Sequence, residues 1–123
     1  MFRVVHFEIS ANDPEKVTAF YKNVFGWDIN KWDGPQPYWM VTTGKEGDGI
    51  NGGIFQPNEV FNGTVNTIEV PSVDDYAAKV TDNGGTVVVQ KFPIPTVGYM
   101  AYCKDIEGTI FGICEFDQTV SAE

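Results

Sequence analysis

The sequence predicts an α+β fold in which two tandem βαβββ modules form a shared cleft. Alternating apolar and polar residues predict the strands, and apolar residues at helical spacing predict two helices. The order of one strand, one helix and three strands then occurs twice along the 123 residues. We therefore expect a single domain over residues 1–123, with module 1 at about 3–56, a linker at 57–63, module 2 at about 64–116 and a short C-terminal tail.

Module 1 is predicted to begin with a strand at residues 3–10. A helix follows, because Asp13 suits the N-cap, Pro14 suits the first helical position and Gly26 suits a left-handed residue that ends a helix. Turn-forming stretches separate three further strands. The apolar stripe of the helix is Val17, Phe20, Tyr21 and Val24, and the later strands are expected at 27–32, 37–43 and 50–56.

Module 2 repeats this order. A strand at 64–70 precedes a helix that Ser72 caps and Asn83-Gly84 ends. The proline-containing segment 91–100 is expected to form part of a cleft wall or to fix a chain crossing. The helix stripe is Val73, Tyr76, Ala77 and Val80, and the later strands are expected at 86–91, 97–103 and 109–116.

The two modules align as an internal duplication. An offset of about 61 residues pairs Phe7-Glu8-Ile9 with Ile68-Glu69-Val70, so that Thr67 becomes the counterpart of His6. Near the last strands the offset is 59. The further matches are Asp13 with Asp74, Tyr38 with Tyr99, and Gly49–Ile54 with Gly108–Ile113.

Each module has one helix, which covers only one face of its sheet. Because side chains alternate along a strand, Phe7 and Ile9 are expected to face the helix. The opposite faces would line the cleft and carry polar residues, for which a bound ligand is one explanation. These cleft residues are His6, Glu8, Thr67 and Glu69.

The chain is strongly acidic, with 8 lysines and arginines against 17 aspartates and glutamates. Binding to a phosphate backbone requires clustered basic residues, so no nucleic-acid partner and no anionic membrane surface is expected. No apolar run approaches the roughly 20 residues that span a bilayer. The N-terminus runs directly into a strand pattern without a signal peptide. These features favour a cytoplasmic protein.

The two cysteines, Cys103 and Cys114, flank a predicted turn. A hairpin centred on this turn would place Cys103 opposite about residue 110, so the two thiols are out of register for a disulfide. Free structural thiols are consistent with a reducing compartment.

A paired βαβββ unit with an inward histidine on its first strand resembles the vicinal oxygen chelate superfamily, which includes glyoxalase I, extradiol dioxygenases, and fosfomycin- and bleomycin-resistance proteins. The resemblance covers about residues 3–116. It is most specific in "HFEISANDPEKVTAFYKNVFGW" and in "CKDIEGTIFGICE", which is similar to the family's Asp-Pro-x-Gly turn with Ile106 in place of proline. It implies this fold and a homodimer, in which the cleft lies within one chain or is completed by modules from two chains. The activity varies among members.

The resemblance also implies four metal-ligand positions, on the first and fourth strands of each module. In this chain they are His6, Gly53, Thr67 and Gly112. Catalytic zinc takes three protein ligands and the non-haem iron triad takes two histidines and a carboxylate. We therefore expect no metal and no other cofactor, and extradiol dioxygenase activity is disfavoured. A carboxylate-rich set of His6, Glu8 and Glu69 is the alternative metal site.

Three hypotheses for function follow, and the sequence leaves open whether the chain is an enzyme. The first is a glyoxalase/bleomycin-resistance-like protein that binds a small organic molecule in the cleft. The second is a glyoxalase-like lyase or isomerase in which Glu8, Glu69 and His6 carry acid–base catalysis, with or without a divalent metal. A purely structural or interaction domain is a third. The candidate ligand-binding residues are His6, Glu8, Thr67, Glu69, Trp39, Phe55, Tyr99 and Tyr102.

Overall fold

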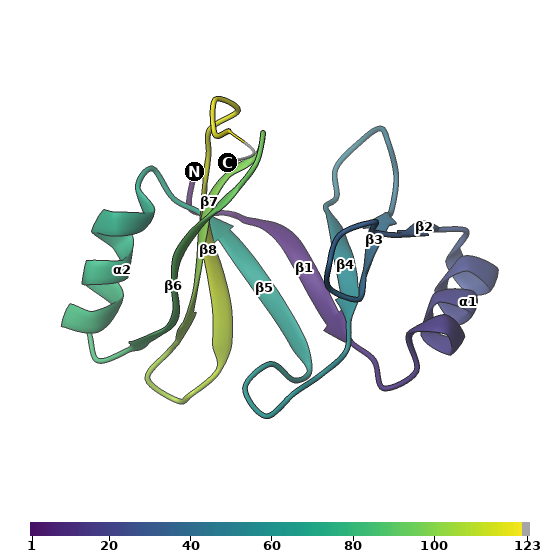
Figure 1. Cartoon of the computed structure of the whole chain (residues 1–123), viewed down its shortest axis with the longest axis horizontal. Helices are drawn as coiled ribbons and strands as arrows, with labels where there is room; N and C mark the ends of the chain where they lie inside the picture. Colours follow the sequence, from purple (N-terminus) through teal and green to yellow (C-terminus); the bar gives the residue numbers. More distant parts are fainter. Residues whose placement is uncertain (122–123) are drawn as a thin grey trace. The chain divides into compact units, whose positions relative to one another are not determined.

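The computed structural model describes residues 1–121 and contains the predicted order of elements (Figure 1). Its elements fall into two compact units. One unit is residues 5–65, and the other is the chain from Asn66 onward together with Met1–Val4. From here on, module 1 denotes the first four strands with the first helix, and module 2 denotes the last four strands with the second helix, although two strands extend past the unit boundary by one or two residues. Each module is built from four strands and one helix, which confirms the α+β class and the tandem βαβββ order.

Module 1 contains a four-stranded sheet in the order β2-β3-β4-β1. Strand β1 pairs with β4 in parallel, and the other neighbours are antiparallel. The linker residue Gly63 holds the end of β1, since its backbone N–H donates to Ser10 Oγ at 2.8 Å. The elements are β1 (Val4–Ser10), α1 (Pro14–Phe25), β2 (Asp28–Lys31), β3 (Tyr38–Thr42) and β4 (Asn51–Phe55).

Helix α1 begins and ends as predicted, but its apolar stripe is partly exposed. Asp13 caps it by accepting from the Lys16 backbone N–H at 3.2 Å, and Gly26 ends it in the left-handed region at φ 71°. The predicted core residues Phe20 and Val24 are instead 57% and 55% exposed. The helix is rotated so that its buried side consists of Pro14, Val17, Thr18 and Tyr21.

Module 2 contains a second four-stranded sheet in the order β5-β8-β7-β6. Its β5 pairs with β8 in parallel, and the backbone of Phe2 and Arg3 also bonds to Glu69 on β5. The apolar stripe predicted for its helix packs in the core of this module as expected. The elements are β5 (Thr64–Glu69), α2 (Val73–Asp82), β6 (Thr86–Ile94), β7 (Gly98–Lys104) and β8 (Ile110–Phe116).

Strand β6 is longer than predicted, because it continues through Lys91 to Ile94. Pro93 is tolerated there since β6 is an edge strand, where a missing N–H leaves no ladder bond unmade. Two register shifts interrupt its pairing with β7. The segment predicted to be a cleft wall or crossing is therefore mostly part of the sheet.

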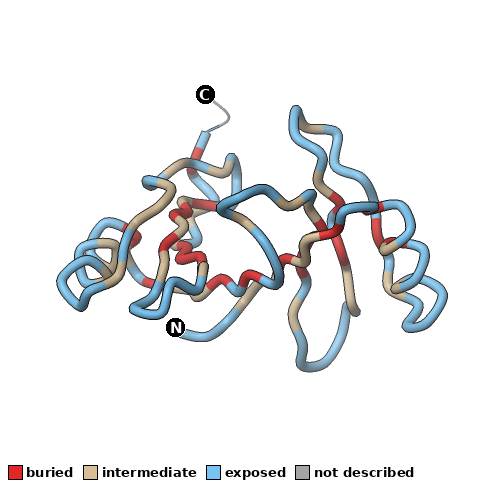
Figure 2. The backbone as a smooth tube through the Cα atoms, turned by 90° about the horizontal axis from the view of Figure 1, so that it is seen from below, coloured by how far each residue is buried: buried red, intermediate tan, exposed pale blue. Residues whose placement is uncertain are grey.

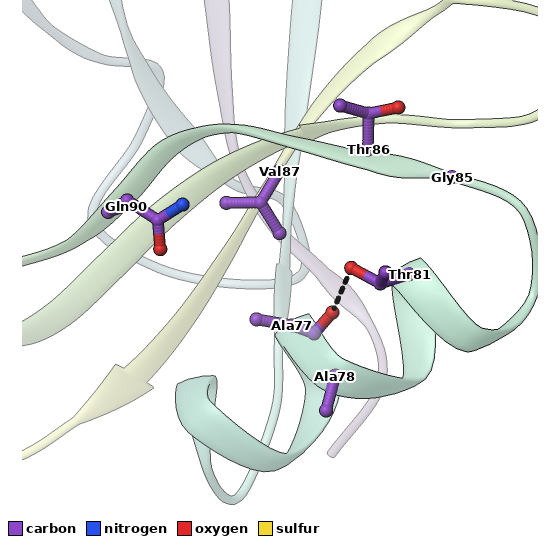
Figure 3. A pocket seen from close by; sticks show the side chains of 7 residues that line it. All are labelled: Ala77, Ala78, Thr81, Gly85, Thr86, Val87 and Gln90. Carbon is purple, nitrogen blue, oxygen red and sulfur yellow. Dashed lines mark hydrogen bonds between the residues drawn. The ribbon is translucent and has the colours of Figure 1, made fainter.

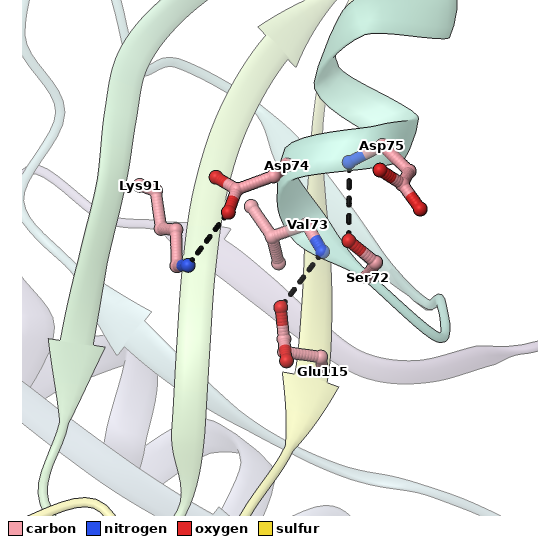
Figure 4. Close-up of polar contacts among 6 residues, drawn as sticks. All are labelled: Ser72, Val73, Asp74, Asp75, Lys91 and Glu115. Atoms are coloured by element: carbon pink, nitrogen blue, oxygen red, sulfur yellow. Dashed lines mark hydrogen bonds and ion pairs between the residues drawn. The ribbon is translucent and has the colours of Figure 1, made fainter.

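The start of α2 is fixed by two side chains (Figure 4). Ser72 Oγ accepts from the Asp75 backbone N–H at 3.1 Å, as its N-cap prediction requires. A carboxylate from β8, Glu115 Oε1, accepts from the Val73 N–H at 2.8 Å. This bond ties α2 to the sheet of module 2 and places a negative charge at the positive end of the helix.

Most buried residues lie on strands, although the edge strand β6 has none, and the outer sides of the helices are exposed (Figure 2). Among residues 1–121, no helix is long and apolar enough to cross a membrane.

Candidate functional site

Each sheet has one face covered by its helix and one face without a helix, which we call the helix-free face. In module 1 the helix-covered side contains Phe7, Ile9 and Ile54. Strand alternation then assigns His6, Glu8 and Ser10 to the helix-free face, together with the β3 and β4 residues beside them. On that face lie His6, Glu8, Ser10, Tyr38, Met40, Gly53 and Phe55.

The helix-free face of module 1 is organised around Gly53. Its backbone pairs with Glu8 on β1 and with Met40 on β3. A Cβ built on Gly53 would collide with the hydroxyl end of Tyr38, so the Tyr38 side chain crosses the sheet directly above this glycine. The Tyr38 hydroxyl then reaches His6 Nε2 at 3.0 Å. Glycine at this position therefore makes room for a phenol–imidazole hydrogen bond.

Burial lowers the pKa of His6, and the negative charge of Glu8 on the same face opposes that shift. A neutral imidazole nitrogen can donate or accept a hydrogen bond, depending on the tautomer. Glu8 itself is only 8% exposed. The face thus joins an imidazole, a phenol and a buried carboxylate within one module, and these groups suit hydrogen bonding to a ligand or proton transfer.

The helix-free face of module 2 is organised around Gly112. Its backbone pairs with Thr67 on β5 and with Tyr102 on β7. A Cβ built on Gly112 would lie 2.6 Å from Thr67 Oγ1 and 2.7 Å from Met100 Cε. Here a thioether covers the glycine where module 1 has a phenol, and the buried first-strand residue is a threonine.

Two further residues of this face, Glu69 and Cys114, are paired in the β5–β8 ladder. Burial raises the pKa of the Cys114 thiol to about 11, with a smaller contribution from the Glu69 carboxylate. Cys103 lies on the helix-covered face, where it pairs with Phe111. Both thiols are free and buried, which confirms that they do not form a disulfide.

Of the eight predicted ligand-binding residues, six lie on the helix-free faces. His6, Glu8 and Phe55 belong to module 1, whereas Thr67, Glu69 and Tyr102 belong to module 2. The other two are on the opposite faces.

Trp39 and Tyr99 require correction, because both point toward the helix of their module. Trp39 is 7% exposed in the core with Val41 and Ile54. Tyr99 packs against the core of module 2, and Lys91 Nζ lies 4.4 Å from its ring centroid. The same ammonium bonds to Asp74 Oδ2 at 3.0 Å, which raises the pKa of Lys91 (Figure 4).

The strand ladders also correct the alignment of the two modules. Glu8 pairs with Gly53, and Thr67 pairs with Gly112. The offsets of 61 and 59 therefore cannot both hold, and an alignment that matches the two glycines makes Thr67 the counterpart of Glu8 at an offset of 59. In that alignment the counterpart of Glu69 is Ser10 instead of Glu8.

The same register changes two other pairs. At the offset of 59, His6 corresponds to Val65 instead of Thr67. Across the antiparallel ladders, Tyr38 corresponds to Met100 instead of Tyr99. A shift of one residue moves a side chain to the other face of a sheet, so Tyr99 and Met100 lie on opposite faces.

The donor set does not fit the metal centre that the family resemblance implies. In the corrected register its four positions are His6, Gly53, Val65 and Gly112, and only the first offers a ligand atom. His6 Nε2 is already bonded to Tyr38, and Tyr38 and Met100 fill the space above the two glycines. Within residues 1–121, no group of three or more His, Cys, Asp or Glu side chains is arranged to hold a metal ion.

A hollow of about 490 Å³ lies between α2 and β6 of module 2 (Figure 3). Its lining includes Ala77, Thr81 and Val87 and contains no ionisable side chain. The Thr81 hydroxyl already donates to the Ala77 carbonyl at 3.3 Å. This hollow therefore offers little chemistry and lies apart from the helix-free face.

Sequence reasoning missed Tyr38, Met100 and the two glycines as parts of these faces. Gly53 and Gly112 were considered only as metal-ligand positions that lack a side chain. A glycine on a strand also marks close approach by a neighbouring side chain, and that signal pointed to a large residue on the next strand. It could not distinguish Tyr38 from Trp39, since both are aromatic neighbours.

Comparisons with known proteins agree with this architecture. Residues 3–44 match a family described as bleomycin resistance protein-like N-terminal. The chain is 31% identical over 110 residues to the putative glyoxylase CFP32 of Mycobacterium bovis and of Mycobacterium tuberculosis, which covers 86% of this chain. It spans 41% of the length of these curated relatives.

Solved structures show the same fold at low sequence identity. A hypothetical protein from Bacillus halodurans superposes with a TM-score of 0.71 at 15% identity, over 97% of both chains. A methylmalonyl-CoA epimerase in complex with methylmalonyl-CoA also gives 0.71 at 15% identity, over 98% of this chain and 99% of the other. The epimerase of Streptomyces coelicolor gives 0.70 at 16% identity, over 100% and 99%. At these identities the likeness concerns the fold alone.

Proposed function

Because the chain belongs to the vicinal oxygen chelate superfamily, with its glyoxalase-like and bleomycin-resistance-like members, we propose that it binds a small organic molecule on the helix-free faces of its paired modules. We further propose that it does so without the metal centre of the family.

The observation that carries the proposal is the hydrogen bond between His6 Nε2 and the Tyr38 hydroxyl above Gly53. It uses the one histidine of the chain for a side-chain contact. Around it lie the buried carboxylate of Glu8, the half-buried ring of Phe55 and the thioether of Met40. A few convergent polar groups among apolar side chains are typical of small-molecule sites.

A broad thermal-shift screen of organic compounds, run with and without divalent metals, tests this function. A ligand that binds only the folded chain raises its melting temperature with concentration. We expect organic ligands that stabilise the wild type and stabilise Tyr38→Phe less. Stoichiometric zinc, nickel, iron or manganese in protein purified without chelator would contradict the metal-free proposal.

The alternative is a glyoxalase-like lyase or isomerase. It is favoured by the buried carboxylate of Glu8 on the face of His6, since such a pair can exchange a proton with a ligand. Glu69 would be the second carboxylate. Glu8→Gln and Glu69→Gln variants that keep full turnover on an identified substrate would rule this alternative out.

The assembly and location of the chain remain predictions. A homodimer is proposed from the family resemblance, and light scattering of the purified protein would test it. Cytoplasmic location is proposed from the acidic composition and the free thiols.

A further inference from the structure

The helix-free face of module 2 contains a buried hydroxyl whose hydrogen-bonding capacity is unused. Thr67 is 1% exposed, and Thr67 Oγ1 has no hydrogen-bond partner among residues 1–121. Burying a hydroxyl without a partner costs free energy, and a donor without an acceptor is rarer in proteins than an acceptor without a donor. The Thr67 hydroxyl is therefore a hydrogen-bond donor for which the described residues provide no acceptor.

The surroundings of Thr67 show where such an acceptor would lie. Thr67, Gly112 and Tyr102 form one row across β5, β8 and β7. Gly112 has no side chain, so the space between Thr67 and Tyr102 is filled by the Met100 methyl group reaching over from the next row. A methionine side chain is unbranched and flexible, which makes it the adaptable part of this surface.

The far side of this row is aromatic. The ring of Tyr102 stacks on that of Phe92 from β6, with centroids 6.2 Å apart and planes 23° from parallel. Flat apolar molecules pack well against such rings. The acceptor that meets Thr67 would thus belong to a planar molecule.

Other side chains on this face indicate the charge of the ligand. A charged ring would lose its hydration beside Met100 and the buried, uncharged Cys114, which is unfavourable. The carboxylate of Glu69 on this face would repel an anion. A neutral molecule avoids both costs.

We infer that the helix-free face of module 2 binds a neutral planar aromatic molecule with one hydrogen-bond acceptor in or on its ring. Thr67 Oγ1 donates to the acceptor, and the ring displaces the Met100 methyl and lies over Gly112 beside Tyr102. The inference rests on the proposed function and assigns a ligand class to one of its two faces.

The chain offers a matched control for Thr67. Thr18 Oγ1, on the buried side of α1 in module 1, is the other buried hydroxyl without a partner among residues 1–121. Thr67→Val and Thr18→Val each replace a buried hydroxyl by a methyl group of similar size. Both variants are expected to fold, because each loses an unsatisfied polar group.

The experiment uses three probes of similar shape: quinoline, which has a ring acceptor; naphthalene, which has none; and N-methylquinolinium, which is a cation. Binding is followed by NMR with methyl-labelled methionine. The chain has three methionines, so the Met100 signal reports on module 2 and the Met40 signal reports on module 1.

Quinoline is expected to shift the Met100 signal saturably and to bind Thr67→Val on the order of tenfold more weakly, with Thr18→Val unchanged. Naphthalene is expected to bind wild type and Thr67→Val equally. Equal quinoline affinity for wild type and Thr67→Val, tighter binding of N-methylquinolinium, or an unmoved Met100 signal with every probe would overturn the inference.

The failure of this inference and that of the proposed function can be told apart. If probes move Met40 alone, or if the thermal-shift screen finds stabilising ligands that Thr67→Val does not affect, the ligand class assigned to module 2 is wrong and small-molecule binding stands. If no compound in the screen stabilises the chain and no probe moves either signal, both are wrong.

Discussion

The helix-free faces of the two modules have the same backbone frame and different chemistry. In both, a glycine of the fourth strand pairs with a buried residue of the first strand and is covered by a side chain from the third. In module 1 these residues are Glu8 and Tyr38, and in module 2 they are Thr67 and Met100. One frame thus supports either a hydrogen-bonded polar group or an apolar surface with one unsatisfied hydroxyl, and two side chains decide which.

The largest expected effect concerns the cysteines, which are confined to module 2. Burial raises the pKa of Cys103, and it raises the pKa of Cys114 to about 11. Since the thiolate is the reactive form, we expect thiol reagents at mildly alkaline pH to label the folded protein on the order of a hundredfold more slowly than the urea-unfolded protein. Cys103→Ala isolates the signal of Cys114. Rapid labelling of the native chain would mean that module 2 opens independently of module 1.

The second prediction compares the two covered glycines. In Gly53→Ala the new methyl group would displace the Tyr38 hydroxyl from His6, and we expect a loss of about 2 to 3 kcal/mol in the free energy of unfolding. In Gly112→Ala one close neighbour is the mobile Met100 methyl, and the expected loss is about 1 kcal/mol. Urea unfolding of both variants measures the difference. A greater loss of unfolding free energy in Gly112→Ala would show that the helix-free face of module 2 is the more tightly packed of the two.

The third prediction concerns the helix starts. Glu115→Ala removes the carboxylate that accepts from the Val73 N–H at the start of α2, and we expect it to destabilise the chain by about 1 to 2 kcal/mol. Its counterpart in module 1 at the offset of 59 is Gln56, which is exposed. Gln56→Ala is the matched control, for which a change within about 0.5 kcal/mol is expected. Equal effects in urea unfolding would contradict a specific role for Glu115.

The smallest effect is a pH dependence confined to module 1, which holds the single histidine. Because burial lowers the pKa of His6 in the folded chain, the unfolded chain takes up this proton first as the pH falls. The contribution of His6 to stability is therefore full above its ordinary pKa of about 6.5 and is lost as the pH falls through the folded value.

NMR titration of the single imidazole and urea unfolding across this range measure the effect. The wild type should lose more stability on acidification than His6→Gln does. An identical acid dependence in the two proteins would show that His6 is not buried as described.

The alternation of residues in the first strand was sufficient to predict that His6 and Glu8 share a face, because side chains of a strand alternate strictly. The caps at Asp13, Gly26 and Ser72 were equally local and were confirmed. The apolar stripe of α1 was not, since Phe20 and Val24 fit helical spacing but lie on the exposed side. Spacing gives the width of an apolar stripe and leaves open which edge of it meets the sheet.

By itself the sequence determined the α+β class and the βαβββ duplication, because both depend on local periodicity. The tertiary structure decided the strand registers within each module, which pair Glu8 with Gly53 and Thr67 with Gly112. It also decided that Gly53 and Gly112 make room for side chains of the neighbouring strand. Such pairings join residues far apart in the chain, and a slip of one or two positions leaves the local pattern nearly unchanged while it alters which side chains meet.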